Sequence, residues 1–97
     1  MSLKELSYDA ATVGISIRRL MESKSEWKGT AAKLLADLKK VAEELKIDTR
    51  SDPWPRSSYK LNLILQKLKE YLKENGMTIE RQRNLVKINN LTVAHFL

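Results

Sequence analysis

Cysteine is absent from this chain of 97 residues, and histidine occurs only once, as His95. Without cysteine the protein can form neither a disulfide framework nor a thiolate metal site. A single histidine near the end of the sequence argues against a zinc centre and against a catalytic triad that uses histidine as its base. We therefore expect no metal, no cofactor and no catalytic residues.

Long apolar runs and nucleotide-binding motifs are also missing. No apolar stretch approaches the ~20 residues of a membrane span, and the opening residues do not form a signal-peptide pattern. There is no GxxxxGK[ST] phosphate loop and no acidic cluster that would hold Mg²⁺. The sequence predicts a cytoplasmic, non-enzymatic protein that has neither a membrane partner nor a small-molecule substrate.

Acidic residues are scarce in the second half of the chain. Residues 1–49 contain nine Lys or Arg and eight Asp or Glu, whereas residues 50–97 contain nine and four, so the net charge of +6 lies almost entirely after residue 49. An uneven basic surface is typical of a protein that binds a polyanion. The alternative is a soluble surface that happens to be rich in lysine.

Two helices are expected in the first half. Apolar residues recur every three or four positions over residues 5–22, the spacing of an amphipathic helix. Thr30 is a good N-cap for a second helix over 31–45, in which the apolar stripe is unbroken. The polar residues 23–29 predict a loop, with Trp27 covering the core at the start of the second helix.

A third helix is expected after a rigid connector. Residues 46–56, KIDTRSDPWPR, include two prolines that cannot lie inside a helix. The helix begins at Ser57 or Ser58, one of which caps it. It ends at about Asn75, because the following Gly76 can adopt the left-handed backbone conformation that stops a helix.

The remaining sequence predicts a β-hairpin. Residues 77–81 and 85–89 alternate β-branched and polar side chains, as in two short antiparallel strands joined by Gln82-Arg83-Asn84. The apolar residues 91–97 are either a last strand or a segment that packs on another domain.

This order of elements predicts the fold class. A mainly helical α+β domain with three helices followed by a two-stranded wing is a winged helix-turn-helix. We expect one such domain over residues 1–97, with its core at about 5–90.

The start of the third helix carries side chains suited to DNA. In a helix-turn-helix, the second helix of the pair lies in the major groove and contacts base edges through its N-terminal residues. Arginine binds guanine or phosphate, serine donates to phosphate and asparagine recognises adenine. A helix N-terminus also attracts phosphate. The expected DNA-binding residues are Arg56, Ser57, Ser58, Tyr59, Lys60, Asn62, Gln66 and Lys67 on the helix, with Arg81, Arg83 and Lys87 on the wing.

Each of these residues also has an ordinary structural interpretation. One serine serves as the helix cap, and Lys67 can be a solvated charge on the helix face. Tyr59 can pack under the connector as readily as it can touch DNA. Leu63 lies off the apolar stripe of the third helix, so that it either meets the wing or forms part of a surface for a protein partner.

Two segments give a more specific indication. They are Glu26-Trp27-Lys28-Gly29-Thr30-Ala31-Ala32-Lys33-Leu34-Leu35 and, after the second helix, Trp54-Pro55-Arg56-Ser57. Together with the following helix and hairpin, they resemble the C-terminal region of phage- and plasmid-type replication proteins, the primase-helicases of mobile elements. The resemblance covers about residues 24–90. It departs from the family in the turn of the wing, where the family often has a glycine-containing basic turn and this chain has Gln82-Arg83-Asn84.

The resemblance implies a winged-helix module at the C-terminal end of a larger polypeptide whose primase and ATPase or helicase activities lie in other domains. Such a module would help to place the protein on origin or template DNA, taken here as duplex DNA, or would contact the other domains of its own polypeptide. It would act in the cytoplasm of a bacterial, archaeal or phage-infected cell. Two alternatives remain: a winged helix that docks on a helicase or another protein, and a small transcriptional regulator.

Overall fold

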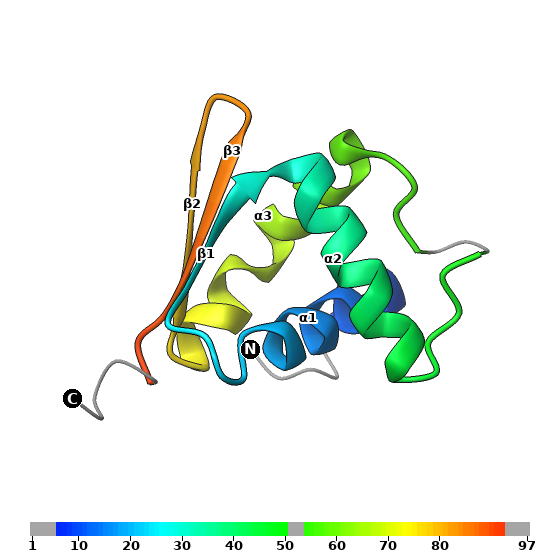
Figure 1. Cartoon of the computed structure of the whole chain (residues 1–97), viewed down its shortest axis with the longest axis horizontal. Coiled ribbons are helices and arrows are strands. Elements are labelled where there is room, and N and C mark those ends of the chain that lie inside the picture. The colour runs from blue at the N-terminus through cyan, green and yellow to red at the C-terminus, as the bar shows by residue number, and fades with distance from the viewer. Residues whose placement is uncertain (1–5, 51–53, 93–97) are drawn as a thin grey trace.

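The computed structural model describes residues 6–50 and 54–92. It contains three helices and a small three-stranded antiparallel sheet, an α+β arrangement (Figure 1). The predictions made for Pro53 and for residues 93–97 concern residues outside the described part of the chain. In chain order the elements are α1 (Tyr8–Leu20), β1 (Glu26–Thr30), α2 (Ala31–Glu44), α3 (Ser58–Glu74), β2 (Met77–Gln82) and β3 (Leu85–Asn90).

The sheet has one strand more than the sequence predicted. The expectation of a loop over 23–29 is wrong for Glu26–Thr30, which forms β1 and pairs antiparallel with β3. The strand order is β1-β3-β2, so β3 lies in the centre and the hairpin strand β2 forms the other edge. The sequence of this short edge strand lacks the alternation of apolar and polar residues that predicts a strand, because only Trp27 among its side chains is buried.

The other predicted elements are confirmed with small changes of boundary. The first helix begins at Tyr8 and ends at Leu20, which is shorter than the expected 5–22. The second and third helices occupy the expected segments. Both hairpin strands are one residue longer than predicted, so the turn between them contains only Arg83 and Asn84.

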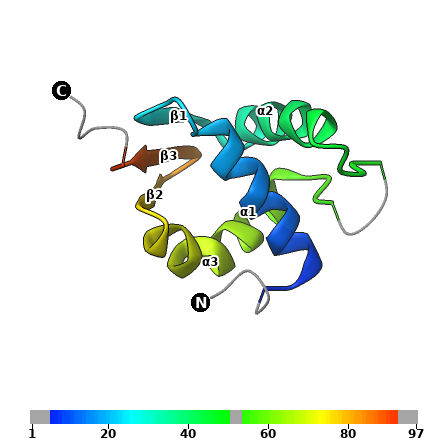
Figure 2. The ribbon, with the colours of Figure 1, turned by 90° about the horizontal axis from the view of Figure 1, so that it is seen from below.

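The core lies between the three helices and the inner face of the sheet. Figure 2 shows α1 running across α2 and α3, with the sheet to one side. Each helix contributes the apolar stripe that its sequence predicts, and β2 and β3 contribute alternate residues. Trp27 and Trp54 are both buried, so each tryptophan belongs to the core. The side chains that are almost fully buried include Val13, Ile17, Leu34, Leu38, Leu61, Leu65, Leu68, Val86 and Ile88.

The helix caps predicted from the sequence are present. The hydroxyl oxygen of Thr30 accepts a hydrogen bond of 3.1 Å from the backbone N–H of Lys33 at the start of α2. The hydroxyl oxygen of Ser57 accepts one of 3.2 Å from the backbone N–H of Lys60 at the start of α3. Each bond satisfies one of the free N–H groups of a first helical turn. The caps therefore set the residue at which α2 and α3 begin.

A polar contact joins β1 to α2. The indole N–H of Trp27 donates a 3.0 Å hydrogen bond to Oδ2 of Asp37, and the ammonium group of Lys33 lies 3.2 Å from Oδ1 of the same carboxylate. Burial acts to raise the pKa of Asp37, but the hydrogen bonds from Trp27 and Lys33, with the positive charges of Lys33 and Lys40, outweigh it. The pKa of Asp37 therefore lies below its usual value, and the ionised form stabilises the fold.

A second polar contact holds the end of β3 to the end of α1. The side-chain amide of Asn90 is buried and donates a 2.8 Å hydrogen bond to the carbonyl oxygen of Met21. The backbone N–H of Asn90 donates one of 2.9 Å to the carbonyl oxygen of Ser25. These bonds fix the base of the β2–β3 hairpin against the helices.

Replacing Asp37 with asparagine should make the protein less stable at neutral pH. The expected loss in the free energy of unfolding at pH 7 is about 1 kcal/mol, the scale of one hydrogen bond. The folded-state pKa of Asp37 is lowered. Its contribution to the free energy of unfolding is therefore present in full above the unfolded-state pKa of about 3.9, and it is lost as the pH falls through the folded-state pKa. The difference between Asp37→Asn and the wild type should therefore close at acid pH.

Urea unfolding followed by tryptophan fluorescence, at several pH values from 7 to 2.5, measures this difference. The matched control is Glu43→Gln, which removes an exposed carboxylate from the same helix. A stability difference for Asp37→Asn that stays constant down to the lowest pH would contradict the assignment.

Gly76 is required where α3 turns into β2. Its φ of 78° is in the left-handed region, and a Cβ at this position would lie 2.5 Å from Cγ2 of Thr92. Gly76→Ala should lower the free energy of unfolding by about 1–2 kcal/mol from the backbone conformation alone. Adding Thr92→Ser should recover only the part that is due to the side-chain contact. Thermal unfolding checks both variants, and a Gly76→Ala protein as stable as the wild type would refute the requirement.

Candidate nucleic-acid interface

The start of α3 and the turn of the β2–β3 hairpin lie at the same end of the molecule (Figure 1). The connector and the cap at Ser57 set the first of these positions, and the pairing of β3 with β1 sets the second. Arg56 and Lys60 lie at the start of α3, whereas Arg81 and Arg83 lie on the hairpin. The fold therefore places at one end of the molecule two groups of basic residues that the sequence separates, although Lys60 lines the flank of α3 toward α1 and Arg81 the flank toward the hairpin.

The connector anchors the start of α3 through buried residues. Trp54 is 4% exposed and Pro55 is also buried, whereas Arg56, the next residue, is exposed. The guanidinium group of Arg56 donates through Nη2 to the carbonyl oxygen of Arg50. This bond holds Arg56 against the connector, and a phosphate or base contact by this guanidinium would have to share or replace it.

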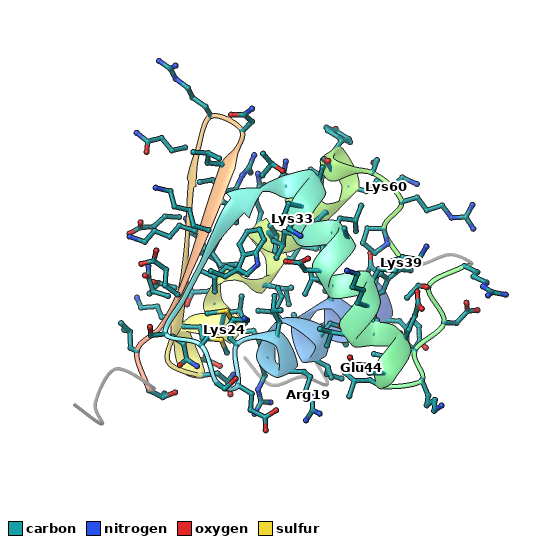
Figure 3. The ribbon with its side chains drawn as sticks, viewed as in Figure 1. Arg19, Lys24, Lys33, Lys39, Glu44 and Lys60 are labelled. Atoms are coloured by element: carbon teal, nitrogen blue, oxygen red, sulfur yellow. The ribbon has the colours of Figure 1, made fainter. Side chains whose placement is uncertain are left out.

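The buried face of α3 consists of the apolar residues that the sequence predicts, and most of the expected DNA-binding residues lie outside this buried face. Tyr59 is 72% exposed, so it does not pack under the connector. Lys60, Gln66 and Lys67 are exposed, and Ser58 is half-buried. Figure 3 shows Lys60 at the upper end of the molecule, far from Arg19 and Lys24.

Asn62 has an unusual environment on this helix. The residue is half-buried, and its Oδ1 is shielded from solvent. Within the part of the chain that the structure describes, this oxygen accepts no hydrogen bond. A shielded polar atom without a partner costs free energy, roughly 1–3 kcal/mol. The position of Asn62 is therefore not explained by the stability of the fold.

One flank of α3 faces the start of α1. Lys60, Leu63 and Lys67 line a shallow hollow with Asp9 and the connector. The hydrogen bond from the Ser7 hydroxyl holds the pKa of Asp9 below its usual value, and the positive charge of Lys67 acts in the same direction. Lys67 thus lies near a carboxylate, which reduces the positive potential it offers to a polyanion.

The other flank of α3 faces the hairpin. Gln66 and Lys69 of α3 line an open hollow with Ile79, Glu80 and Arg81 of β2. Arg81 shares a face of β2 with the buried residues Met77 and Ile79, as the alternation of a strand requires. Lys69 was not among the expected site residues. It lies three positions after Gln66 on the helix, and that spacing was the signal that could have identified it.

The hairpin divides its basic residues between two faces. Arg83 lies in the turn with a φ of 57° and is exposed. Lys87 belongs to the face of β3 opposite Val86 and Ile88, and its ammonium group lies 3.6 Å from a carboxylate oxygen of Glu26. The structure therefore places Arg81 beside α3 and Lys87 on the outer side of the sheet. The three predicted wing residues, Arg81, Arg83 and Lys87, therefore do not lie on one face of the hairpin.

Among residues 6–50 and 54–92, no group of three or more acidic or histidine side chains could hold a metal ion. Within those same ranges no helix is long and apolar enough to cross a membrane.

Comparison with known proteins places the chain in a family. No curated protein and no solved structure matches it. The model of the family described as the AICE RepA C-terminal domain matches residues 13–94, from within α1 to beyond β3. The resemblance to the C-terminal region of replication proteins is thereby confirmed, and the family supports a role in DNA replication. The chain belongs to the AICE RepA C-terminal domain family, a replication-protein family of integrative conjugative elements.

Proposed function

We propose that this domain is a non-catalytic DNA-binding module of a replication protein, and that it holds duplex DNA through α3 and the β2–β3 hairpin. The observation that carries the proposal is the position of the start of α3 and the hairpin turn at one end of the molecule. Arg56 and Lys60 lie at the first, and Arg81 and Arg83 at the second. This placement would allow α3 to enter the major groove while the hairpin lies over the neighbouring backbone.

The order of elements supports the same proposal. Helix, strand, helix, helix and then two strands, with β3 between β1 and β2, supports the assignment of a winged helix in which the β2–β3 hairpin would be the wing. In that arrangement α3 is the recognition helix. Its first turn presents free backbone N–H groups as well as basic side chains, and both attract phosphate.

The charge distribution gives a second, independent argument. Residues 50–97, a segment that includes α3 and the hairpin, hold nine Lys or Arg and only four Asp or Glu. Such a surface attracts DNA and releases its counterions, so binding should weaken steeply with salt. The proposal therefore assigns duplex DNA as the partner and leaves catalysis to other domains.

The parent protein we propose is a primase-helicase of a mobile element, with this domain in its C-terminal part. The module would place the primase and ATPase domains on origin or template DNA, and would touch those domains directly. The family membership supports replication as the process, and the tryptophan motifs at the starts of α2 and α3 support this particular kind of replication protein.

One observation favours a second candidate function, docking on a protein. Tyr59 and Leu63 are 72% and 42% exposed on the outer face of α3. Exposed apolar groups on one helix face are typical of an interaction surface. Such a complex would be insensitive to salt and would form without DNA.

Charge reversal at the start of α3 tests the proposed function. Arg56→Glu with Lys60→Glu should reduce duplex affinity by a factor of roughly 100 or more at low salt, because two phosphate contacts become repulsive. The matched control is Arg19→Glu with Lys24→Glu, the same change of charge at the other end of the molecule (Figure 3). Fluorescence anisotropy measures affinity, and circular dichroism checks the fold. Equal losses in the two double variants would show that only net charge matters.

Single substitutions test the geometry of the wing. Arg81→Ala and Arg83→Ala should each weaken binding and reduce the slope of log affinity against log salt by about 0.9, the value for one lost phosphate contact. Lys87→Ala, which removes a similar charge from the outer side of the sheet, should leave the slope nearly unchanged. A larger effect for Lys87 than for Arg81 would place DNA on the opposite face of the hairpin and reject the proposed docking.

A further inference from the structure

The outer face of α3 is defined by four residues near its start. Tyr59, Asn62, Leu63 and Gln66 have the spacing of one helix face, at positions i, i+3, i+4 and i+7. We call these four residues the α3 stripe. It contains two amides, one aromatic ring and one branched apolar side chain, and it contains neither lysine nor arginine.

Three basic residues of α3 lie beside the stripe, whereas Lys73, at i+7 from Gln66, continues its face beyond Glu70. Lys60 and Lys67 line the hollow toward α1, and Lys69 lines the hollow toward β2. A helix in the major groove has base edges in front of its outermost face and a phosphate backbone on each side. In a major groove these three lysines would face phosphates and the stripe would face the bases, although Leu63 and Gln66 border the same two hollows as the lysines.

Glu70 limits the length of helix that can approach DNA. It follows Gln66 at i+4, is exposed and continues the face of the stripe. A carboxylate on that face repels a polyanion. Close approach is therefore confined to the first turns of α3, the part that contacts bases in a helix-turn-helix.

The chemistry of the stripe matches one type of base pair. Asparagine and glutamine amides pair with N6 and N7 of adenine, and apolar side chains contact the methyl group of thymine. Guanine is contacted through arginine or lysine, which the stripe lacks. Oδ1 of Asn62 is shielded from solvent and has no hydrogen-bond partner in the described residues. The side chain must therefore rotate to reach a base, and that rotation breaks no bond to this oxygen.

We propose that α3 recognises A·T base pairs in the major groove, with Asn62 contacting adenine and Leu63 contacting the thymine methyl group. The inference rests on the proposed function, because it assumes that α3 enters the groove. It extends that function by naming the class of DNA site and by giving the exposed Leu63 a nucleic-acid role. Tyr59 supplies further apolar contact at the end of the stripe, where it is 72% exposed.

The thymine contact can be tested by removing one methyl group per base. Three duplexes of equal length are compared at a fixed salt concentration: an A·T-rich duplex, the same duplex with uracil in place of thymine, and a G·C-rich duplex. The wild type should bind the first most tightly and should lose about fourfold on the uracil duplex, the scale for losing the burial of one methyl group. In Leu63→Ala the ratio of thymine to uracil affinity should fall to about one.

The matched control is Lys67→Ala, which removes a cation from the flank of the same helix. It should weaken binding to all three duplexes alike and leave the thymine-to-uracil ratio unchanged, because a phosphate contact does not distinguish bases. If the ratio falls equally in Lys67→Ala and Leu63→Ala, the methyl contact is not made by Leu63 and the inference is overturned.

The adenine contact is tested with 7-deaza-adenine, which lacks the N7 acceptor. The wild type should bind the modified A·T-rich duplex more weakly than the normal one, and Asn62→Ala should bind both equally. Thermal unfolding should show Asn62→Ala to be at least as stable as the wild type, since the substitution removes a shielded, unpaired oxygen. A wild type that ignores the missing N7 would overturn the assignment of Asn62.

The outcomes separate this inference from the proposed function. Steeply salt-dependent binding that is equal for all duplexes retains DNA binding and rejects base recognition. The absence of binding to every duplex rejects both. Undiminished affinity and an unchanged thymine-to-uracil ratio in Leu63→Ala would reject the inference and assign the exposed face to a protein partner.

Discussion

The pairing of β1 with β3 is the constraint on which the rest of the structure depends. It joins a strand between the first two helices to the last strand of the domain. Trp27 of β1 is buried, and its indole N–H is bound to Asp37 on α2, so the strand is fixed to the helices as well as to the sheet. Without this pairing the sheet would consist of β2 and β3 alone, and a two-stranded hairpin contributes little stability by itself. β1 therefore helps to set the position of the hairpin relative to α3, together with the bond from Asn90 to Met21 and the buried side chains of β2 and β3.

The same constraint decides which basic residues can act together. Once β3 is registered against β1 and β2, alternate side chains face α3 or face outward. Arg81 falls on the α3 side and Lys87 on the outer side, where Glu26 of β1 lies within ion-pair distance. A shift of one residue in the register would exchange these positions. The different positions of Arg81 and Lys87 thus depend on the backbone hydrogen bonds of β1, although no residue of β1 is proposed to contact DNA.

The two faces of α3 differ in composition because only one of them is buried. Leucine and isoleucine at helical spacing bury one face against α1 and the sheet, which leaves the opposite face in water whatever its composition. That outer face carries amide and apolar groups in its centre and lysines at its sides. A core-facing role does not account for this distribution, and neither does solubility, because Tyr59 and Leu63 are exposed. The proposed contact with DNA would account for it, because thymine methyl groups in the major groove lie between two phosphate backbones.

The sequence by itself determined the three helices, their caps at Thr30 and Ser57, the stop at Gly76 and the hairpin, because periodicity and capping are local properties of the chain. It also determined the excess of positive charge after residue 49 and the replication-protein resemblance. It did not determine β1, a short edge strand with a single buried side chain whose partner lies far away in the sequence. Nor did it determine which candidate residues share a face. The exposure of Tyr59, the bond that holds Arg56 to the connector and the separation of Lys87 from Arg81 were decided only by tertiary packing, since each depends on contacts between segments that no local pattern connects.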